Sequence, residues 1–276
     1  MSRKLFAMLL IVLLCVGAAS AEIVGRHSMV NFSEQDAAVH MSILPGEIFI
    51  SVDPSCITVK FFDSLSVMLM ALGKGEIDSI TVPRAVGNYI LKNNADFTLK
   101  AFNWWNNVES TLSFGSSSEN AELMKKFNEA ITAMKQDGTL PLLEKKYIDM
   151  YDTRSVLPPV TFENFADAGT ITAAVTGDLP PIDYVDASGT PAGFNVAVLA
   201  EIGRRLHLNI KTVNVDTGAR ITALTSGRVD VIFWVRGHVV NGISIKEPFI
   251  DKVNNDTVIL SEPYYYWHEQ YFIGRK

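Results

Sequence analysis

The stretch ALGKGEIDSI (residues 71–80) returns as ALTSGRVDVI at residues 223–232, and both copies read Ala-Leu-x-x-Gly-x-(Ile/Val)-Asp-x-Ile. Apolar residues at helical spacing lead into each copy, namely Leu65, Leu69 and Leu72 in the first and Ile221 and Leu224 in the second, and predict a short helix before each glycine. Gly75 and Gly227 stand where the two helices should end, because glycine tolerates the left-handed backbone of a helix stop. The β-branched runs that follow are typical of buried parallel strands. The repeat therefore predicts two similar α/β lobes.

The second copy lies in the clearer half of the chain, which reads as a βαβαβ unit. Its parts are a strand at 170–175, a Gly- and Pro-rich loop at 177–193, a helix at 194–208, a strand at 209–215, and then the repeated unit. Ligands of open α/β sheets bind beyond the carboxyl ends of parallel strands. We therefore expect Asp178, after the first strand, and Trp234 and Arg236, after the third, to approach one crevice.

The N-terminus resembles a secretory signal peptide over residues 1–21. Arg3 and Lys4 precede an uncharged apolar run, and Ala19-Ser20-Ala21 forms an A-x-A cleavage site. The apolar run is short for a membrane span. Lipid attachment at Cys15 is not expected, because a lipoprotein signal places a small residue where this chain has leucine. The sequence thus predicts a periplasmic or otherwise extracytoplasmic protein.

Charge and cysteine content exclude several classes of function. The formal net charge of −6 becomes −8 without the signal peptide, which carries two basic residues and no acidic ones. An acidic exported chain is a poor candidate for nucleic acid or anionic membranes. Cys56 would be the only remaining cysteine, so no internal disulfide is expected. The histidines show no metal-ligand spacing, so we expect neither a metal nor another cofactor.

Several segments resemble type II periplasmic binding proteins, the family 3 extracellular solute-binding proteins. The stretch from VTGDLPPIDYV to SGRVDVI resembles their first lobe, and SEPYYYW (261–267) looks like the hinge segment that closes it. Residues 61–96 look like their second lobe, and residues 112–148, with the DGTL turn, are similar to their C-terminal helices. The resemblance implies an α/β fold of two lobes, each with a mostly parallel sheet flanked by helices.

The order of these segments is circularly permuted relative to that family, since the second-lobe half comes first. The implied division is a signal peptide (1–21), a second-lobe-like lobe (22–108) and a first-lobe-like lobe (109–276), the last comprising C-terminal helices (112–150), a linker (151–165), the βαβαβ half (166–262) and a hinge segment (263–276). Within residues 22–55, which align only loosely, we expect a helix at 34–44 and a strand at 47–52.

Family members typically hold an amino acid through an arginine of the first lobe and an acidic residue of the second. This sequence departs from both anchors. The family arginine position falls on Gly242, and the nearest cation is Arg236; the acid position falls on Pro83, which Arg84 follows. The aromatic residue expected before the Pro-Pro pair is Leu179. The departures imply a different ligand, such as an anion, or a degenerate cleft.

The resemblance implies a monomeric solute-binding protein that captures a small polar ligand, amino-acid-like or anionic, for an ABC transporter permease. The expected ligand-binding residues are Arg236, Trp234, Asp178, Tyr184 and Arg84. Each also has a plain structural alternative: a surface ion pair, core packing, a turn cap or an exposed loop position. Two other functions stay open: a ligand-free extracytoplasmic interaction or sensing module, and, more remotely, a dehydratase-like enzyme. No nucleophile or P-loop motif supports an enzyme.

Overall fold

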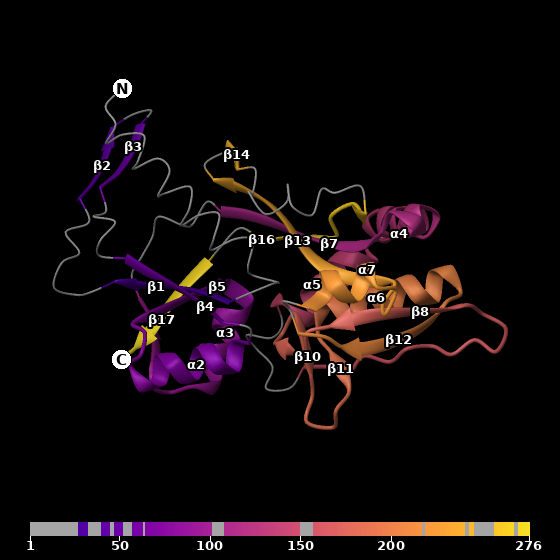
Figure 1. Ribbon diagram of the computed structural model, residues 1–276, viewed down its shortest axis with the longest axis horizontal. Helices are drawn as coiled ribbons and strands as arrows, with labels where there is room; N and C mark the ends of the chain where they lie inside the picture. The colour runs from indigo at the N-terminus through magenta and orange to yellow at the C-terminus, as the bar shows by residue number, and fades with distance from the viewer. Residues whose placement is uncertain are drawn as a thin grey trace.

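A computed structural model describes the backbone of residues 27–32, 40–44, 47–51, 57–62, 64–100, 108–149, 157–216, 219–240, 243–245, 257–267 and 270–276. Side chains are described for residues 64–80, 82–100, 111–149, 157–216, 219–233, 257–266 and 271–276. The predicted signal peptide, both cysteines and Gly242 lie outside these ranges. The described chain forms two α/β units side by side (Figure 1). We name them the smaller unit (27–100 and 270–276) and the larger unit (108–267).

The larger unit is built on a sheet that has seven strands among the described residues. They are β7 (Val108–Ser117), β8 (Thr170–Val175), β12 (Asn209–Asn214), β13 (Val231–Val240), β14 (Ile243–Ile245), β15 (Val258–Leu260) and β16 (Tyr265–Trp267). The main order is β12-β8-β13-β7-β15, with β14 beside β13 and β16 beside β7. Strands β12, β8 and β13 run parallel, whereas β7 is antiparallel to β13, β15 and β16. The parallel strands therefore share one carboxyl edge.

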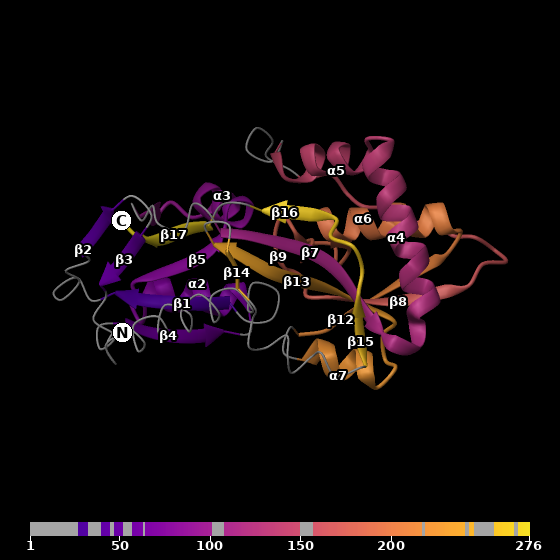
Figure 2. The same cartoon turned by 90° about the horizontal axis from the view of Figure 1, so that it is seen from above.

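Helices cover both faces of this sheet (Figure 2), which agrees with the burial of consecutive residues at the end of β8 and the start of β13. The helices are α4 (Ala121–Gln136), α5 (Thr139–Tyr147), α6 (Phe194–Leu206) and α7 (Arg220–Thr225), with the short 3₁₀ helix η2 (Ser118–Asn120) before α4. Phe194, Val198 and Ile202 recur every four residues along α6 and are fully buried. Each such side chain contributes about 1.5–3 kcal/mol by burial. The helix predicted at 194–208 is thus confirmed as α6.

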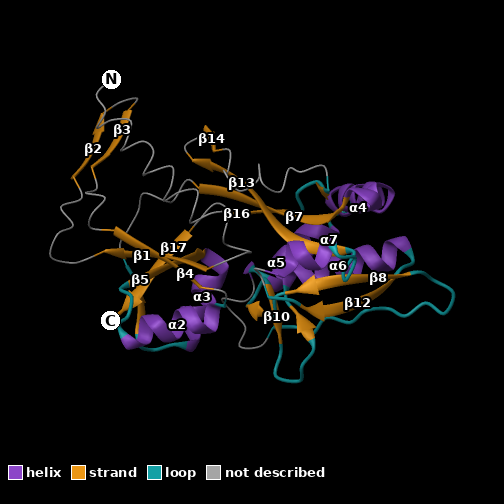
Figure 3. Cartoon of the chain, in the orientation of Figure 1, coloured by secondary structure: helices purple, strands orange, loops and turns teal. Residues whose placement is uncertain are grey.

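The smaller unit contains helices α2 and α3 and several short antiparallel strand pairs (Figure 3). Its elements are β1 (His27–Phe32), β2 (His40–Leu44), β3 (Glu47–Ser51), β4 (Ile57–Phe62), α2 (Leu65–Lys74), β5 (Ser79–Pro83), α3 (Arg84–Asn93), β6 (Phe97–Leu99) and β17 (Gln270–Arg275). The pairs are β1 with β4, β2 with β3, and β17 with both β5 and β6. The parallel order predicted for both lobes is therefore observed, within the described residues, in the larger unit.

The chain passes between the two units twice, once before β7 and once after β16. These strands pair antiparallel, with Tyr265 opposite Leu112 and Trp267 opposite Ser110. After β16 the chain enters the smaller unit, where β17 lies between β5 and β6. The sequence-based division assigned residues 263–276 to the first-lobe-like lobe as its hinge segment. Residues 270–275 instead form β17, whose backbone hydrogen bonds pair it with β5 and β6 of the smaller unit.

Residues 112–148 pack on the same sheet as residues 170–260, because β7 pairs with β13 and because α4 and α5 contact α6. This is the arrangement expected if the C-terminal helices of the family precede its first-lobe half. The permuted order itself, and the residue boundaries of the lobes, stay predictions.

Two local predictions are wrong, for residues 34–44 and 177–193. The expected helix at 34–44 is contradicted by β2, whose backbone pairs with β3 as a hairpin. The helix expected before Gly75 is confirmed: α2 begins at Leu65, after the Ser64 hydroxyl that accepts a hydrogen bond from the amide of Val67 at 3.2 Å. The loop at 177–193 contains a small sheet, formed by β9 (Asp178–Leu179), β10 (Asp183–Val185) and β11 (Pro191–Ala192).

The two copies of the repeat adopt similar backbone conformations. Gly75 ends α2 with φ 77°, and Gly227 follows α7 with φ 70°, so both glycines adopt the predicted left-handed conformation. The aspartate three residues on ties each copy to a neighbouring strand. Asp230 accepts a hydrogen bond from the amide of Thr172 at 2.7 Å, and Asp78 lies 3.6 Å from the Arg275 guanidinium. The expected helix–glycine–strand unit is therefore present twice.

Candidate functional site

A buried ion pair lies at the carboxyl edge of the larger sheet. Nη2 of Arg220 in α7 lies 3.2 Å from Oδ2 of Asp183 in β10, and each side chain is 2% exposed. Nη1 of Arg220 donates to the carbonyl oxygen of Phe233 in β13 at 3.1 Å. The guanidinium thus connects the helix after β12, the small sheet after β8 and the edge of β13. These are the positions at which open α/β sheets bind ligands.

The surroundings of Asp183 keep its charge compensated. The backbone amide and the hydroxyl of Thr176 donate to Asp183 Oδ2 at 3.1 and 2.8 Å. Burial raises the pKa of the Asp183 carboxyl, and Arg220 and the Thr176 hydrogen bonds oppose that rise. Burial likewise lowers the pKa of Arg220, against the attraction of Asp183. Removing either partner would leave the other in a medium that disfavours charge.

Tyr264 borders the same cluster as a neutral phenol. Its hydroxyl donates to Oδ1 of Asn195 at 2.9 Å inside the protein. Burial, and then the Asp183 charge, raise the pKa of Tyr264 well above its ordinary value, so it stays protonated at neutral pH. Asn195 is the second residue of α6. The hydrogen bond therefore fixes the start of α6 against the segment that leads into β16.

Asp178 links the two units. Its Oδ2 accepts a hydrogen bond from the amide of Leu65, the first residue of α2, at 2.6 Å. A carboxylate at a helix N-terminus is stabilised by the exposed amides and the helix dipole. Asp178 also contributes to the electrostatic field at Arg220. The carboxyl edge of the larger unit therefore faces α2 of the smaller unit, with Asp178 as the connecting side chain.

Two other predicted site residues fall beside these features. Tyr184 is the cross-strand partner of Asp178 in the β9–β10 pair and is partly exposed. Arg84 begins α3 directly after β5, as predicted, and is exposed. Its charge lowers the pKa of Tyr265, against a larger rise caused by burial. Arg84 is therefore close enough to β16 to act electrostatically across the two units.

The sequence predicted that Trp234 and Arg236 follow the end of their strand. The structure contradicts this prediction. Both lie inside β13, opposite Ser113 and Thr111 of β7. The strand continues to Val240 because β7 supplies backbone hydrogen-bond partners along its length. The side chains of these two residues lie outside the described set, so their part in a site stays a proposal.

The sequence analysis missed Arg220, Asp183 and Tyr264. A signal for Arg220 was present: aligning the two copies of the repeat places it at the position of Met68, which is fully buried in α2. A charged residue at a buried position of a repeat must have a compensating partner. The Asp183 partner could not be read from periodicity, because it comes from the intervening loop.

Within the described residues, no group of acidic, histidine or cysteine side chains could hold a metal ion. None of the helices described is both long and apolar enough to cross a membrane. The described part of the site therefore consists of hydrogen-bonding groups, one buried ion pair and aromatic rings.

The two α/β units and the polar carboxyl edge can be compared with known proteins. Residues 171–276 match the family model of bacterial extracellular solute-binding proteins, family 3. That segment is similar to the family, in agreement with the resemblance to type II periplasmic binding proteins that the sequence shows. A search of curated proteins finds no match.

Similar solved structures include binding components of transporters. AgaA of A. tumefaciens R10, in complex with agropinic acid, is 10% identical, with 86% of this chain and 61% of that chain covered and a TM-score of 0.40. The aliphatic sulphonate binding protein SsuA from Escherichia coli is 13% identical, with 78% and 53% covered and a TM-score of 0.35.

A phosphate-binding protein of a phosphate ABC transporter from Streptococcus pneumoniae TIGR4 is 11% identical, with 61% of this chain and 53% of that chain covered and a TM-score of 0.31. The chain thus spans between about half and three fifths of the length of these proteins. The ligands named for them are their own.

Proposed function

We propose that this chain is an extracytoplasmic solute-binding protein that captures a small polar ligand, amino-acid-like or anionic, between its two units for an ABC transporter. One observation carries the proposal: Asp178, at the carboxyl edge of the larger unit, accepts a hydrogen bond from the first amide of α2 in the smaller unit. The edge at which α/β sheets bind ligands therefore faces the second unit, as closure around a ligand requires.

The proposed ligand-binding residues are Arg236, Trp234, Asp178, Tyr184 and Arg84. In this proposal Asp178 closes the interface, and Tyr184 borders it on the next strand. Arg84 and Arg236 supply positive charge for an anionic group of the ligand. The buried Arg220–Asp183 pair holds α7, β10 and the end of β13 together at the carboxyl edge of the larger sheet. Export by the N-terminal signal and a monomeric state belong to the same proposal, and so does the absence of catalysis.

A second candidate function is an interaction module without a small ligand. The same bond favours it, because Asp178 already occupies the N-terminus of α2, where an anionic ligand group would be attracted. In this reading the polar groups of the interface hold the units together and leave no ligand-binding cleft.

A thermal-shift screen separates the two candidates. The full chain is heated with L-amino acids, dipeptides and small organic dicarboxylates, because a ligand that binds only the folded state stabilises it by about 2.7 kcal/mol at 100 times its Kd. We expect at least one probe to raise the melting temperature. Failure of all probes would support the interaction module.

Arg236→Ala tests the assigned site. We expect it to abolish the probe-induced rise and to leave the unliganded melting temperature nearly unchanged. Arg228→Ala is the matched control, because Arg228 is exposed on the turn after α7. Loss of the unliganded fold would identify Arg236 as a structural partner, and an intact rise would remove it from the site.

A further inference from the structure

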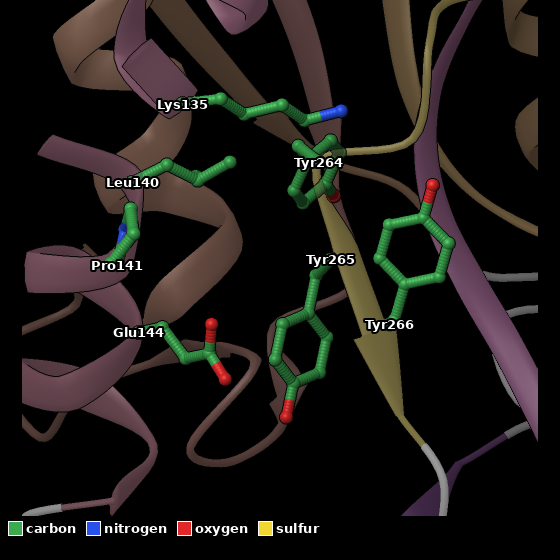
Figure 4. Close-up of a pocket in the computed structure, with 7 residues that line it drawn as sticks. All are labelled: Lys135, Leu140, Pro141, Glu144, Tyr264, Tyr265 and Tyr266. Atoms are coloured by element: carbon green, nitrogen blue, oxygen red, sulfur yellow. The ribbon is translucent and has the colours of Figure 1, made fainter. Parts of the chain in front are cut away.

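A cavity of about 360 Å³ lies between helices α4 and α5 and the segment that enters β16 (Figure 4). Its lining residues are Lys135, Leu140, Pro141, Glu144, Tyr264, Tyr265 and Tyr266. The volume falls within the range of about 300–1,000 Å³ that small-molecule sites occupy. None of the five proposed ligand-binding residues lines it, so it is a separate feature of the molecule.

The aromatic wall of this cavity is fixed from behind. The Tyr264 hydroxyl is bonded to Asn195, which holds the nearly buried tyrosine ring in place behind the cavity. The centroid of the Tyr264 ring lies 4.6 Å from that of Phe114, and the centroid of the Tyr265 ring lies 5.1 Å from that of Phe194. Both tyrosines are nearly buried, at 2% and 9% exposure. The wall is therefore preformed and needs no ordering when a ligand enters.

The opposite wall is anchored to α6. The Arg205 guanidinium donates to Asp137 Oδ2 at 2.7 Å and to the Thr139 hydroxyl at 2.9 Å. These two residues flank the turn between α4 and α5. The bonds hold that turn, and with it the side of the cavity that carries Leu140 and Pro141.

The cavity has charges of opposite sign at its two ends. In Figure 4 the ammonium group of Lys135 points toward Tyr264, and the Glu144 carboxylate points toward Tyr265. The Glu144 charge adds to the burial that raises the pKa of Tyr265. Among the described residues Lys135 forms no ion pair. A molecule lying along the cavity would therefore meet a cation at one end and a carboxylate at the other.

We propose that this cavity is a second ligand site, which binds a small zwitterion with an apolar body. The carboxylate of the ligand pairs with Lys135, and its ammonium group lies against Glu144 and the face of a tyrosine ring. The apolar body lies between Leu140 and the rings of Tyr264 and Tyr265. The proposal goes beyond capture of a ligand between the units, because no residue of that interface takes part.

Three probes with the same body test the assignment by isothermal titration calorimetry on the full chain. Phenylalanine carries both charges, phenethylamine only the ammonium group, and 3-phenylpropanoate only the carboxylate. We expect phenylalanine to bind about tenfold more tightly than either single-charge probe, as one additional charge-assisted hydrogen bond provides. Equal affinities for the three probes, or no binding by any of them, would overturn the proposal.

Two variants assign the ends of the cavity. Lys135→Met should reduce phenylalanine to the affinity of phenethylamine, and Glu144→Gln should reduce it to that of 3-phenylpropanoate. Lys125→Met, an exposed change elsewhere on α4, is the control and should alter nothing. If Glu144→Gln lowers the unliganded melting temperature, Glu144→Asp provides the folded comparison and should weaken phenylalanine binding.

Arg236→Ala distinguishes this site from the proposed interface between the units. Phenylalanine binding should persist in that variant, with its dependence on Lys135 and Glu144 unchanged. Loss of binding in Arg236→Ala, together with insensitivity to Lys135→Met, would place the probe between the units and contradict the second site. Failure of the interface screen with the dicarboxylates, which carry no ammonium group, would leave this result unaffected.

Discussion

The helices before the two copies of the repeat hold very different residues at one buried position. Aligning residues 71–80 with 223–232 places Met68 of α2 opposite Arg220 of α7. Their side chains are 0% and 2% exposed. A methionine there needs only van der Waals contacts. A guanidinium needs partners, which Asp183 and the carbonyl of Phe233 provide.

The difference between Met68 and Arg220 shows that the repeated helix–glycine–strand segment can fold without a charge at this buried position. A buried ion pair gives little net stability compared with apolar packing, although breaking it is costly. The pair in the larger unit lies over the carboxyl edge that faces α2, whereas Met68 belongs to the core of the smaller unit. We infer that Arg220 and Asp183 serve the proposed ligand site rather than the stability of the sheet.

The largest expected effect comes from breaking the pair. Asp183→Asn should lower the free energy of unfolding by about 3–5 kcal/mol, because it leaves a buried guanidinium uncompensated. Arg220→Met should cost less at low pH, since burial raises the pKa of Asp183. The folded state then binds a proton more readily than the unfolded state, so stability falls as pH rises above the ordinary value near 4.

Urea denaturation at pH 4 and pH 7 measures this prediction. Arg220→Met should be more stable, relative to wild type, at the lower pH. A loss below 1 kcal/mol in both single variants would mean that water compensates the charges and that the pair is not isolated as described.

The next effect concerns the shared helix stops. Gly75→Ala and Gly227→Ala should each destabilise the protein by about 1–2 kcal/mol, because both glycines have positive φ. An added Cβ at 227 meets no atom within 4 Å, and at 75 the nearest atoms belong to Arg275 at 3.5 Å. The losses should therefore be equal, as measured by urea denaturation. Gly73→Ala, within α2, is the control and should be neutral or stabilising. Clearly unequal losses would show that the two stops differ in more than sequence.

A smaller effect separates the starts of the two helices. α2 has Ser64 and Asp178 at its N-terminus, whereas the N-cap residue of α7 makes no side-chain hydrogen bond. Asp178→Ala should reduce stability by about 1 kcal/mol. Native-state hydrogen exchange at α2 should increase with it. Ser64→Ala serves as the comparison within the same helix. Unchanged exchange in Asp178→Ala would show that the two units are not joined through this bond.

The smallest expected effect is a pH dependence at the turn between α4 and α5. Hydrogen bonds from Thr139, and then Arg205, lower the pKa of Asp137 to about 2 from 3.8. A depressed carboxyl pKa stabilises the folded state above 3.8, and that contribution is lost as pH falls toward 2. Asp137→Asn should remove this part of the acid dependence in pH-jump denaturation curves. An unaltered acid limb would exclude the contribution.

The sequence predicted the elements whose signals are local. The strand at 170–175, the buried face of α6 and both glycine stops follow from periodicity and backbone preference, and the structure confirms them. The repeat and the family resemblance together predicted the two-unit arrangement, whereas the ligand site stays a prediction.

The sequence did not predict features that depend on distant pairing. The length of β13 follows from β7, which is more than a hundred residues earlier, and the strandlike residues 40–44 follow from their pairing with β3. The Arg220–Asp183 pair depends on how the loop at 177–193 folds over α7. Charge patterns along the chain do not encode such contacts, so the buried centre of the candidate site became visible only in three dimensions.

The most direct test of the central claim uses the double variant Asp183→Leu/Arg220→Met, which gives the larger unit the apolar solution of the smaller one. Its melting temperature is measured alone and with the L-amino acids, dipeptides and dicarboxylates used for wild type. We predict an unliganded melting temperature equal to or above that of wild type, and loss of the probe-induced rise that wild type shows. A rise as large as that of wild type would contradict a role of the buried pair in ligand binding.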